Sequence, residues 1–287
     1  MRDMTESKSS RPTTIQSSSN PSHRYIQHST TYEAYTDYGI HYHEYYELYY
    51  FVEGDVDYIV EGKEYHLTPH SLLLLSPYSF HGVRVNSDAP YTRYFVYFSP
   101  EVFPPEHRKL LLSCFPDNQK NSPKEVFYEH TENYNLLLYL KNLVASQKQP
   151  RSIRNHYFDI YTCALLAQIN LMSQALRPSP VTNTGSQTIA AILDYINAHA
   201  NEDITLDILS ERFFISKHYL NRAFKKATGT TVIDYVIYKR TIHARQLLYN
   251  GHSATEAGLA SGFHDYSSFY RAYKKTFGCS PKQDRKS

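Results

Sequence analysis

Residues 216–229 read SKHYLNRAFKKATG, and residues 266–278 read YSSFYRAYKKTFG. Both segments predict a short amphipathic helix with the order aromatic, polar, Arg, small, aromatic, Lys-Lys, closed by a glycine. Each follows a shorter predicted helix and a tight turn, which is the order of a helix-turn-helix whose second helix enters the major groove of DNA. Two such units in one chain indicate a DNA-binding protein.

The apolar positions of each predicted helix decide which side chains face DNA. Leu220 and Phe224 in the first helix, and Phe269 and Tyr273 in the second, are expected to turn inward. The residues expected to contact base edges are His218, Asn221, Arg222, Tyr266, Ser267, Tyr270 and Arg271. Asn and Arg suit this role because they make paired hydrogen bonds to adenine and guanine. Phosphate contacts are expected from Lys217, Lys225, Lys226, Arg240, Lys274 and Lys275.

The charge distribution supports a nucleic-acid partner for the C-terminal part alone. From Ser186 onward the chain has 14 Lys and Arg against 9 Asp and Glu, a net charge of +5. The remainder has 16 against 19, a net charge of −3. Residues 232–248 predict a longer helix that joins the two units and fixes their separation. If the units address successive turns of one DNA face, that separation is about 34 Å.

The N-terminal part reads as β-structure. Residues 1–22 are rich in Ser, Thr, Pro, Gln and Asn, which predicts a disordered tail. Strands are predicted at residues 47–52, 57–60, 64–67, 71–75 and 94–98, separated by turn signals such as Glu61-Gly62-Lys63. Short strands at this spacing indicate a small antiparallel barrel or jelly roll, which we place at residues 23–105.

Helical periodicity begins after Pro104-Pro105. One apolar face contains Leu136, Leu140 and Leu143, and a second face contains Tyr157, Ile160, Tyr161, Ala164, Leu165, Gln168, Leu171 and Met172. These faces fit either packing on the barrel or pairing with a second chain, so residues 106–176 form a helical, candidate dimerisation region. Residues 177–186 are the predicted linker, and residues 187–287 the all-α DNA-binding domain. The predicted fold is a two-domain α+β protein.

Residues 262–281, GFHDYSSFYRAYKKTFGCSP, closely resemble the signature of AraC-type transcriptional regulators. The resemblance extends upstream over about a hundred residues, and implies a bacterial regulator with two helix-turn-helix units per chain. Three departures from the family pattern are visible: Ala257-Gly258, Asp284, and a first turn, Phe214-Ile215, without glycine. Small side chains at 257 and 258 are expected to thin the core under the second unit, which favours base reading by the first.

A histidine-rich motif marks the N-terminal domain. His41 and His43 share one face of a strand, Glu47 follows, and His81 arrives from another strand. This pattern resembles the first motif of cupins, where two His, a Glu and a later His bind a divalent metal. The barrel is therefore expected to be cupin-like. The second cupin motif is degraded, because Thr68-Pro69-His70-Ser71 lacks the expected glycine.

Three roles remain open for this motif. Imidazole and carboxylate suit iron, manganese, zinc or nickel, and a metal with open positions supports an enzyme. AraC-type regulators often keep such a remnant in a sensor that holds an effector, and this role is favoured for His41, His43, Glu47, His81 and Tyr49. Tyrosines on the inner face could stack on a sugar ring. The third role is plain polar packing.

We therefore expect a cytoplasmic AraC-type transcriptional activator that needs no cofactor. Its expected partners are double-stranded DNA, a small-molecule effector such as a sugar or sugar derivative, a second copy of the chain, and RNA polymerase. The rival hypotheses are a metal-dependent cupin enzyme fused to a DNA-binding domain and a regulator without a ligand. No membrane span is expected, because the longest aliphatic run is Leu72 to Leu75. The sparse cysteines indicate no disulfide framework.

Overall fold

The computed structural model describes residues 23–32, 37–116, 126–179 and 187–284 of the 287-residue chain. The chain divides into two compact units, one within residues 13–183 and one within residues 184–287. The first is built on β-sheets and the second is all helical, which confirms the two-domain α+β fold. The predicted disordered tail and residues 180–186 of the predicted linker lie outside the described residues.

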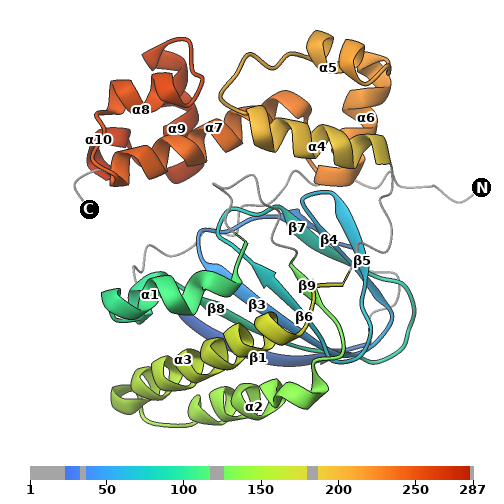
Figure 1. Ribbon diagram of the computed structural model, residues 1–287, viewed down its shortest axis with the longest axis vertical. Coiled ribbons are helices and arrows are strands. Elements are labelled where there is room, and N and C mark those ends of the chain that lie inside the picture. The colour runs from blue at the N-terminus through green and yellow to red at the C-terminus, as the bar shows by residue number, and fades with distance from the viewer. Residues whose placement is uncertain (1–22, 33–36, 117–125, 180–186, 285–287) are drawn as a thin grey trace, which may run out of the picture. The chain divides into compact units, whose positions relative to one another are not determined.

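Two antiparallel sheets pack face to face in the N-terminal unit (Figure 1). The five-stranded sheet has the order β1 (Arg24–Thr31), β8 (Tyr91–Phe98), β3 (Tyr46–Glu53), β6 (Ser71–Leu75), β9 (Phe127–Tyr128). The four-stranded sheet has the order β2 (Asp37–His41), β7 (His81–Val85), β4 (Val56–Val60), β5 (Lys63–His66). The described strands form a sandwich of two sheets, which fits the jelly roll among the two expected architectures and not a closed barrel. Strand spacing predicts short strands, but it does not say whether the end strands pair.

Strand β3 shows how one sheet serves two cores. Leu48 and Tyr50 point to the outer side, where they join a cluster with the helices. Tyr49 and Phe51 point to the inner side, where they pack with residues of the four-stranded sheet such as Tyr58. Because alternate residues of a strand face opposite sides, a strand with apolar layers on both faces is buried along nearly its whole length.

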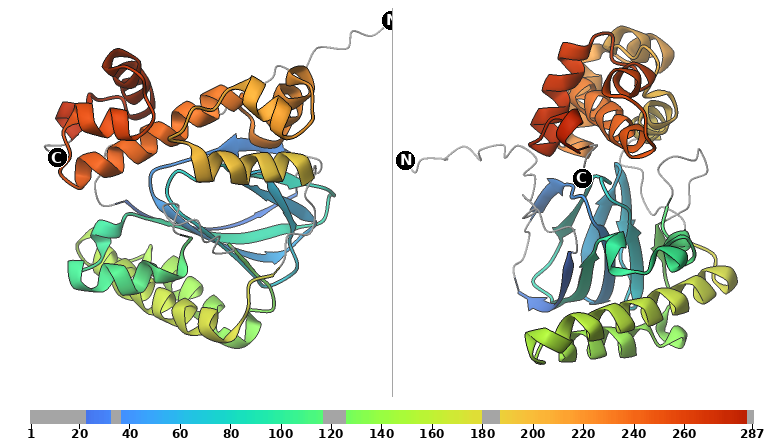
Figure 2. Two further views of the ribbon diagram at one scale, coloured as in Figure 1. Left: turned by 45° about the horizontal axis from the view of Figure 1, so that its top comes forward. Right: turned by 90° about the vertical axis from the view of Figure 1, so that its left-hand side faces the viewer.

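Helices cover the outer side of the five-stranded sheet (Figures 1 and 2). They are η1 (Pro100–Val102), α1 (Pro105–Leu111), η2 (Leu112–Cys114), η3 (Glu132–Tyr134), α2 (Leu136–Ser146) and α3 (Arg151–Ala175). Leu140 and Leu165 are fully buried against the sheet, as one face of each helix was expected to be. Arg24 of β1 forms an ion pair with Asp159 of α3, with Nε and Oδ1 2.6 Å apart. The start of the predicted linker contacts β9, because Ser179 N donates a hydrogen bond to Phe127 O.

The C-terminal unit is built of seven described helices. They are α4 (Gln187–His199), α5 (Leu206–Arg212), α6 (Lys217–Thr228), α7 (Val232–Tyr249), α8 (Ala254–Ala260), α9 (Tyr266–Phe277) and α10 (Pro281–Asp284). Helices α5 and α6 form the first helix-turn-helix unit and α8 and α9 the second, with α7 between them (Figure 1). Among the described helices of either unit, none is long and apolar enough to span a bilayer.

The second helices of the two helix-turn-helix units, α6 and α9, have the same kinds of cap at both ends. Ser216 caps α6 by accepting a hydrogen bond from Tyr219 N, and Asp265 caps α9 by accepting one from Ser268 N. At the other end, Gly229 and Gly278 adopt the left-handed conformation, with φ of 75° and 73°. Such caps satisfy backbone groups that a helix end leaves open, and they fix where each helix starts and stops.

The core under the second unit is not thinned, contrary to the expectation from Ala257 and Gly258. A Cβ atom at Gly258 would lie 2.9 Å from the ring of Phe269. The ring of Phe269 therefore fills the space that a side chain at position 258 would take. Ala257 and Phe269 are both fully buried. The small residues let α8 and α9 approach closely.

The loop between α4 and α5, residues 200–205, contacts two later parts of the chain, helix α7 and the turn between α8 and α9. Arg240 of α7 donates from Nε to Ala200 O at 2.7 Å and from Nη2 to Glu202 O at 2.6 Å. Gly262, in the turn of the second unit, has φ of 85°, and a Cβ there would lie 2.5 Å from Asn201 O. The loop that leads into the first unit is therefore packed against both α7 and the second unit.

Asp284, one of the departures from the family pattern, is a hydrogen-bond acceptor for three side chains of α7 and α9. Its buried carboxylate accepts hydrogen bonds from Arg245 Nε at 2.8 Å, Tyr249 at 3.1 Å and Tyr273 at 2.6 Å. Burial, with the nearby carboxylate, raises the pKa of Tyr273. The last helix, α10, is thus attached to α7 and α9 through one carboxylate.

Candidate DNA-binding and ligand-binding sites

The second helix of each unit presents a polar, basic face. The exposed residues are Lys217, His218, Arg222, Lys225 and Lys226 on α6, and Tyr266, Ser267, Arg271, Lys274 and Lys275 on α9. Leu220, Phe224, Phe269 and Tyr273 are fully buried, as predicted. Both faces therefore combine side chains able to bond base edges with a basic last turn suited to phosphates.

Asn221 and Tyr270 are half-buried, whereas the other predicted base-reading residues are exposed. The Oδ1 atom of Asn221 is buried and has no hydrogen-bond partner among the described residues. A side-chain amide contacts adenine through both its oxygen and its nitrogen, so Asn221 does not present this pair to solvent. Arg222, one position further along α6, is exposed.

Arg240 must be corrected from a predicted phosphate ligand to a structural residue. It is 8% exposed, and its guanidinium is engaged by the backbone carbonyls of the α4–α5 loop. From sequence alone, an arginine in a predicted helix is expected to be exposed to solvent. Only the tertiary contact shows that this arginine points inward, and no local signal marks it.

The exposed face also contains charge pairs of its own. Lys217 on α6 forms an ion pair with Asp207 on α5, and both side chains are more than half exposed. Arg271 donates from Nη2 to Ser268 Oγ at 3.2 Å. Exposed ion pairs contribute about 0–1 kcal/mol, so phosphate can compete with Asp207 for Lys217.

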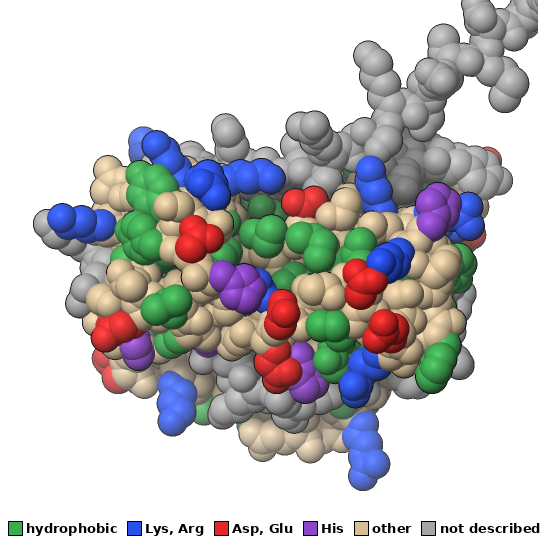
Figure 3. Space-filling view, turned by 90° about the horizontal axis from the view of Figure 1, so that it is seen from above, with side chains coloured by type: hydrophobic (Ala, Val, Ile, Leu, Met, Phe, Trp, Pro, Cys, Tyr) green, Lys and Arg blue, Asp and Glu red, His purple; other side chains and the backbone are tan. Residues whose placement is uncertain are grey.

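Helix α7 sets the distance between the two faces. It has 18 residues, and at 1.5 Å per residue it is about 27 Å long. This length is of the same order as one turn of DNA. Figure 3 shows the face of the C-terminal unit: several lysine and arginine side chains gather at its upper left, others lie singly at the right and lower edges, and acidic, apolar and histidine side chains occupy its middle.

In the N-terminal unit, the structure brings His43, Glu47 and His81 together. His43 Nε2 lies 2.9 Å from Glu47 Oε2, and His81 Nε2 lies 3.1 Å from the same oxygen. The three residues are 3%, 2% and 1% exposed. Burial lowers the pKa of His43. Burial alone would raise the pKa of Glu47, but the two histidines lower it to about 2.

His41 and Tyr49 lie beside this cluster without joining it. The ring of His41 is half-buried and 4.4 Å from the ring of His81, and burial lowers the pKa of His41 to about 4. The hydroxyl of Tyr49 is hydrogen-bonded to that of Tyr91, and burial raises the pKa of Tyr49 well above its usual value. Four of the five predicted effector residues are thus almost fully buried and bonded to other protein groups.

Half-buried side chains on the inner sides of the two sheets are the better candidates to contact a ligand. Arg93 of β8 has its guanidinium 3.9 Å from the ring of Tyr91 and 5.9 Å from that of Tyr38 on β2. It donates to Thr31 Oγ1 at 2.9 Å. Phe95 and Tyr97 continue the same face of β8, with ring centroids 5.3 Å apart. Alternation along β8 in the sequence places 93, 95 and 97 on one face, and this signal could have found them.

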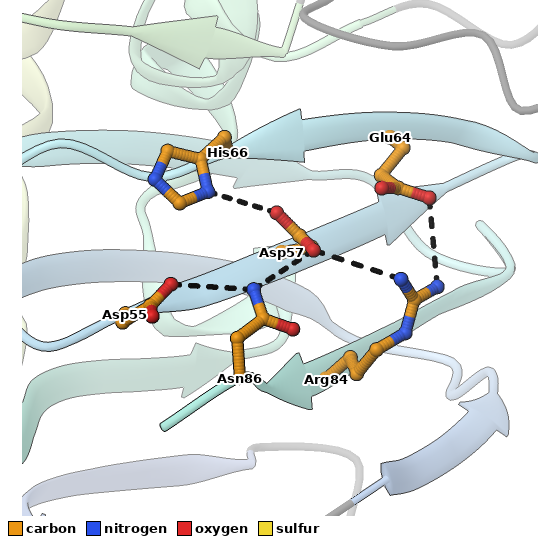
Figure 4. Close-up of polar contacts among 6 residues, drawn as sticks. All are labelled: Asp55, Asp57, Glu64, His66, Arg84 and Asn86. Atoms are coloured by element: carbon orange, nitrogen blue, oxygen red, sulfur yellow. Dashed lines mark hydrogen bonds and ion pairs between the residues drawn. The ribbon is translucent and has the colours of Figure 1, made fainter. Parts of the chain in front are cut away.

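Arg84 differs from Arg93 because it lies on the outer face of the four-stranded sheet. Figure 4 shows its guanidinium between Asp57 and Glu64, at 3.6 and 3.5 Å. Asp57 also contacts His66 Nδ1 at 2.9 Å and Asn86 Nδ2 at 2.9 Å. Arg84 is held in this solvent-side network, so it does not face the space between the sheets.

Comparisons with known proteins match both parts of the chain. Residues 22–154 match the family model of the AraC-like ligand binding domain, and residues 209–287 match that of a helix-turn-helix domain. The HTH-type transcriptional activator RhaS of Escherichia coli O6:H1 is 22% identical over 87% of this chain and 88% of its own length. RhaS of E. coli O139:H28 is 23% identical with the same coverage.

A solved structure also resembles the chain. Wild-type ToxT from Vibrio cholerae, bound to an unsaturated fatty acid, is 11% identical, and the match covers 93% of this chain and 95% of that one with a TM-score of 0.38.

Proposed function

The chain belongs to the AraC-type transcriptional regulators, and from this premise we propose that it is a DNA-binding transcriptional activator controlled by a small molecule. The observation that supports DNA reading most directly is the pair of capped helices, α6 and α9, each with a buried apolar face and an exposed polar face that ends in two lysines. RNA polymerase is the proposed partner on DNA, in keeping with relatives that are activators.

Arg222 and Lys225 provide the test of base reading. Arg222→Ala is expected to cost about 1–3 kcal/mol at one base position and to relax the preference there, since an Arg–guanine contact is lost. Lys225→Ala is expected to weaken all sequences alike and to reduce the slope of log K against log[salt] by about 1. The measurement is selection from a random DNA pool, followed by titration of the selected site at several salt concentrations. Equal effects of the two variants on all sequences would contradict base reading by α6.

We place the effector between the two sheets, against Arg93, Tyr38, Phe95 and Tyr97. Aromatic faces and a cation with spare donors suit a polyhydroxylated ring such as a sugar or an acidic sugar derivative. Binding can shift DNA affinity only if the effector binds two arrangements of the regulator differently. A regulator without a ligand would show the same DNA affinity with every compound.

The arginine pair Arg93 and Arg84 makes this location testable. In a calorimetric or thermal-shift screen of sugars and sugar acids, Arg93→Ala is expected to weaken a compound that binds wild type by about tenfold or more, because one charged hydrogen bond contributes about 1.5–3 kcal/mol. Arg84→Ala is the matched control, since it removes the same side chain from the outer face. Equal affinity in wild type and Arg93→Ala would move the effector elsewhere.

We propose that α3 forms the interface with a second copy of the chain. This 25-residue helix buries one face, yet Ile153, Tyr157, Ile160 and Leu171 are 39%, 40%, 61% and 61% exposed. With Ala164 and Ala167 they recur at steps of four and three residues, the spacing of a coiled-coil seam. A seam on one helix is self-complementary about a two-fold axis.

Ile160→Glu is expected to convert the dimer to a monomer, because two carboxylates would face each other in the seam. The mass in solution, measured by light scattering or sedimentation at micromolar concentration, should fall by half. Asn155→Glu adds the same charge to an exposed position of α3 outside the seam and should leave the mass unchanged. A monomeric wild-type protein, or a dimeric Ile160→Glu protein, would rule out this interface.

A further inference from the structure

We propose that Phe214 contacts the 5-methyl group of a thymine in the major groove that receives α6. The inference rests on the proposed DNA-binding function and adds a base-specific apolar contact to it. Phe214 lies in the turn between α5 and α6, two residues before Ser216, which caps the N-terminus of α6. The position is also one of the departures from the AraC-type pattern, because this turn contains no glycine.

The backbone at Phe214 is held in a conformation that a bulky side chain rarely adopts. Its φ of 53° lies in the left-handed region. Hydrogen bonds on either side fix the turn, because Ile215 N donates to Ser210 O at 3.1 Å and Ser210 Oγ donates to Ile215 O at 2.5 Å. A glycine would satisfy the same turn without strain. Strained residues of this kind gather at binding sites, so the turn by itself gives no reason for a phenylalanine.

The ring of Phe214 adds nothing to the protein core. The residue is 94% exposed. The preceding residue, Phe213, is half-buried, and its ring centroid lies 5.9 Å from that of Tyr195 on α4. The two consecutive phenylalanines therefore point in different directions, one to the core of the first unit and one to solvent. The apolar surface of Phe214 is available to a partner.

The second unit shows why only the first turn can present a side chain in this way. Gly262 occupies the matching position with φ of 85°, and Phe263 N donates to Gly258 O at 3.1 Å as Ile215 N does to Ser210 O. A Cβ atom at Gly262 would lie 2.5 Å from Asn201 O. The second turn thus faces the α4–α5 loop, whereas the first turn faces solvent.

The place of Phe214 in the chain favours DNA as its partner. In helix-turn-helix proteins, the N-terminal residues of the second helix contact base edges. Lys217 and His218, the first two residues of α6, are exposed. Phe214 comes three residues before Lys217, so their Cα atoms are at most about 11 Å apart. The thymine methyl is the apolar group of the major groove, and phenylalanine is among the side chains that contact it.

The test measures whether one thymine methyl depends on the ring. Full-length protein is titrated with the duplex that it enriches from a random pool, and with duplexes in which each thymine is replaced singly by deoxyuridine, which lacks only the methyl group. Wild type is expected to lose about three- to tenfold in affinity at one thymine, the value of one buried methyl-sized group. Phe214→Gly should bind the thymine and uracil duplexes equally, no more tightly than wild type binds the uracil duplex.

Two further variants separate the ring from the backbone and from general apolar surface. Phe214→Asn also removes the ring but keeps a side chain that tolerates the left-handed conformation, so it should lose the thymine effect as Phe214→Gly does. Leu138→Ala removes a side chain of α2 that is 56% exposed in the N-terminal unit, and it should keep the thymine effect. Urea unfolding of each variant shows that a loss of affinity does not come from a loss of folding.

A uracil penalty that is the same in wild type and Phe214→Gly at every thymine would refute the contact. So would a Phe214→Gly protein that binds the selected duplex as tightly as wild type. In either case wild type still selects a motif, the DNA-binding function stands, and the exposed ring is left to a protein partner. A wild-type protein that enriches no motif would instead refute the DNA-binding function, and this contact with it.

Discussion

Gly262→Ala is expected to lower the free energy of unfolding of the C-terminal unit by about 2–4 kcal/mol and to abolish most specific DNA binding at 37 °C. The residue has φ of 85°, where an alanine costs about 1 kcal/mol. The added Cβ would also lie 2.5 Å from Asn201 O, and backbone cannot give way as a flexible side chain can. Urea unfolding of the full-length protein, followed by hydrogen exchange within residues 187–284, measures the loss.

Phe214 offers the reverse substitution in the first unit. It occupies the matching place in the turn between α5 and α6, has φ of 53°, and is 94% exposed. Phe214→Gly should therefore stabilise the unit by about 0.5–1 kcal/mol, because a strained backbone is relieved and little packing is lost. The opposite signs at equivalent positions form a strict comparison. A Gly262→Ala protein within 0.5 kcal/mol of wild type would show that the α4–α5 loop can move aside.

Asp284→Ala should cost about 3–5 kcal/mol, which is the range for breaking one partner out of a buried ion pair. It leaves the Arg245 guanidinium, 15% exposed, and two tyrosine hydroxyls without their acceptor. Asp284→Asn keeps an acceptor oxygen for one tyrosine and should cost less. The two variants are compared by urea denaturation with fluorescence of the tyrosines near α10.

Asp207→Ala is the control for this series, because Asp207 is exposed and pairs only at the surface with Lys217. Its effect should stay below about 1 kcal/mol. If Asp284→Ala were equally mild, the anchoring role of the C-terminal carboxylate would be refuted, and the packing of Tyr273 and Phe269 alone would hold α9 in place.

Local patterns predicted the C-terminal unit well because its helices carry their own signals. The buried pairs Leu220–Phe224 and Phe269–Tyr273, and the caps at Ser216 and Asp265, follow from spacing and residue type. Arg240 and Gly258 were misjudged because their roles depend on residues about twenty or more positions away or on another helix. A one-dimensional pattern shows that a residue is on a helix, but not which neighbour fills the space beside it.

The N-terminal unit was predicted in outline only. Strand texture and the motif of His43, Glu47 and His81 were visible in the sequence, and the structure brings these three together. The number of sheets, the short strand β9, and the burial of Tyr49 depend on pairings between distant strands. For this reason the effector residues predicted from the sequence differ from the half-buried inner-face residues, such as Arg93, that the structure favours as ligand contacts.

The contacts that hold the α4–α5 loop also affect the combined DNA affinity of the two helix-turn-helix units. Because Arg240 and Gly262 hold that loop from α7 and from the second turn, the two reading helices share one packed body. Once α6 is seated, α9 searches almost no volume, and its effective concentration at the adjacent groove is set by geometry and not by diffusion. If α6 and α9 both contact DNA as proposed, each helix can bind poorly by itself, and an operator is recognised only where both of its parts occur at the spacing of the protein.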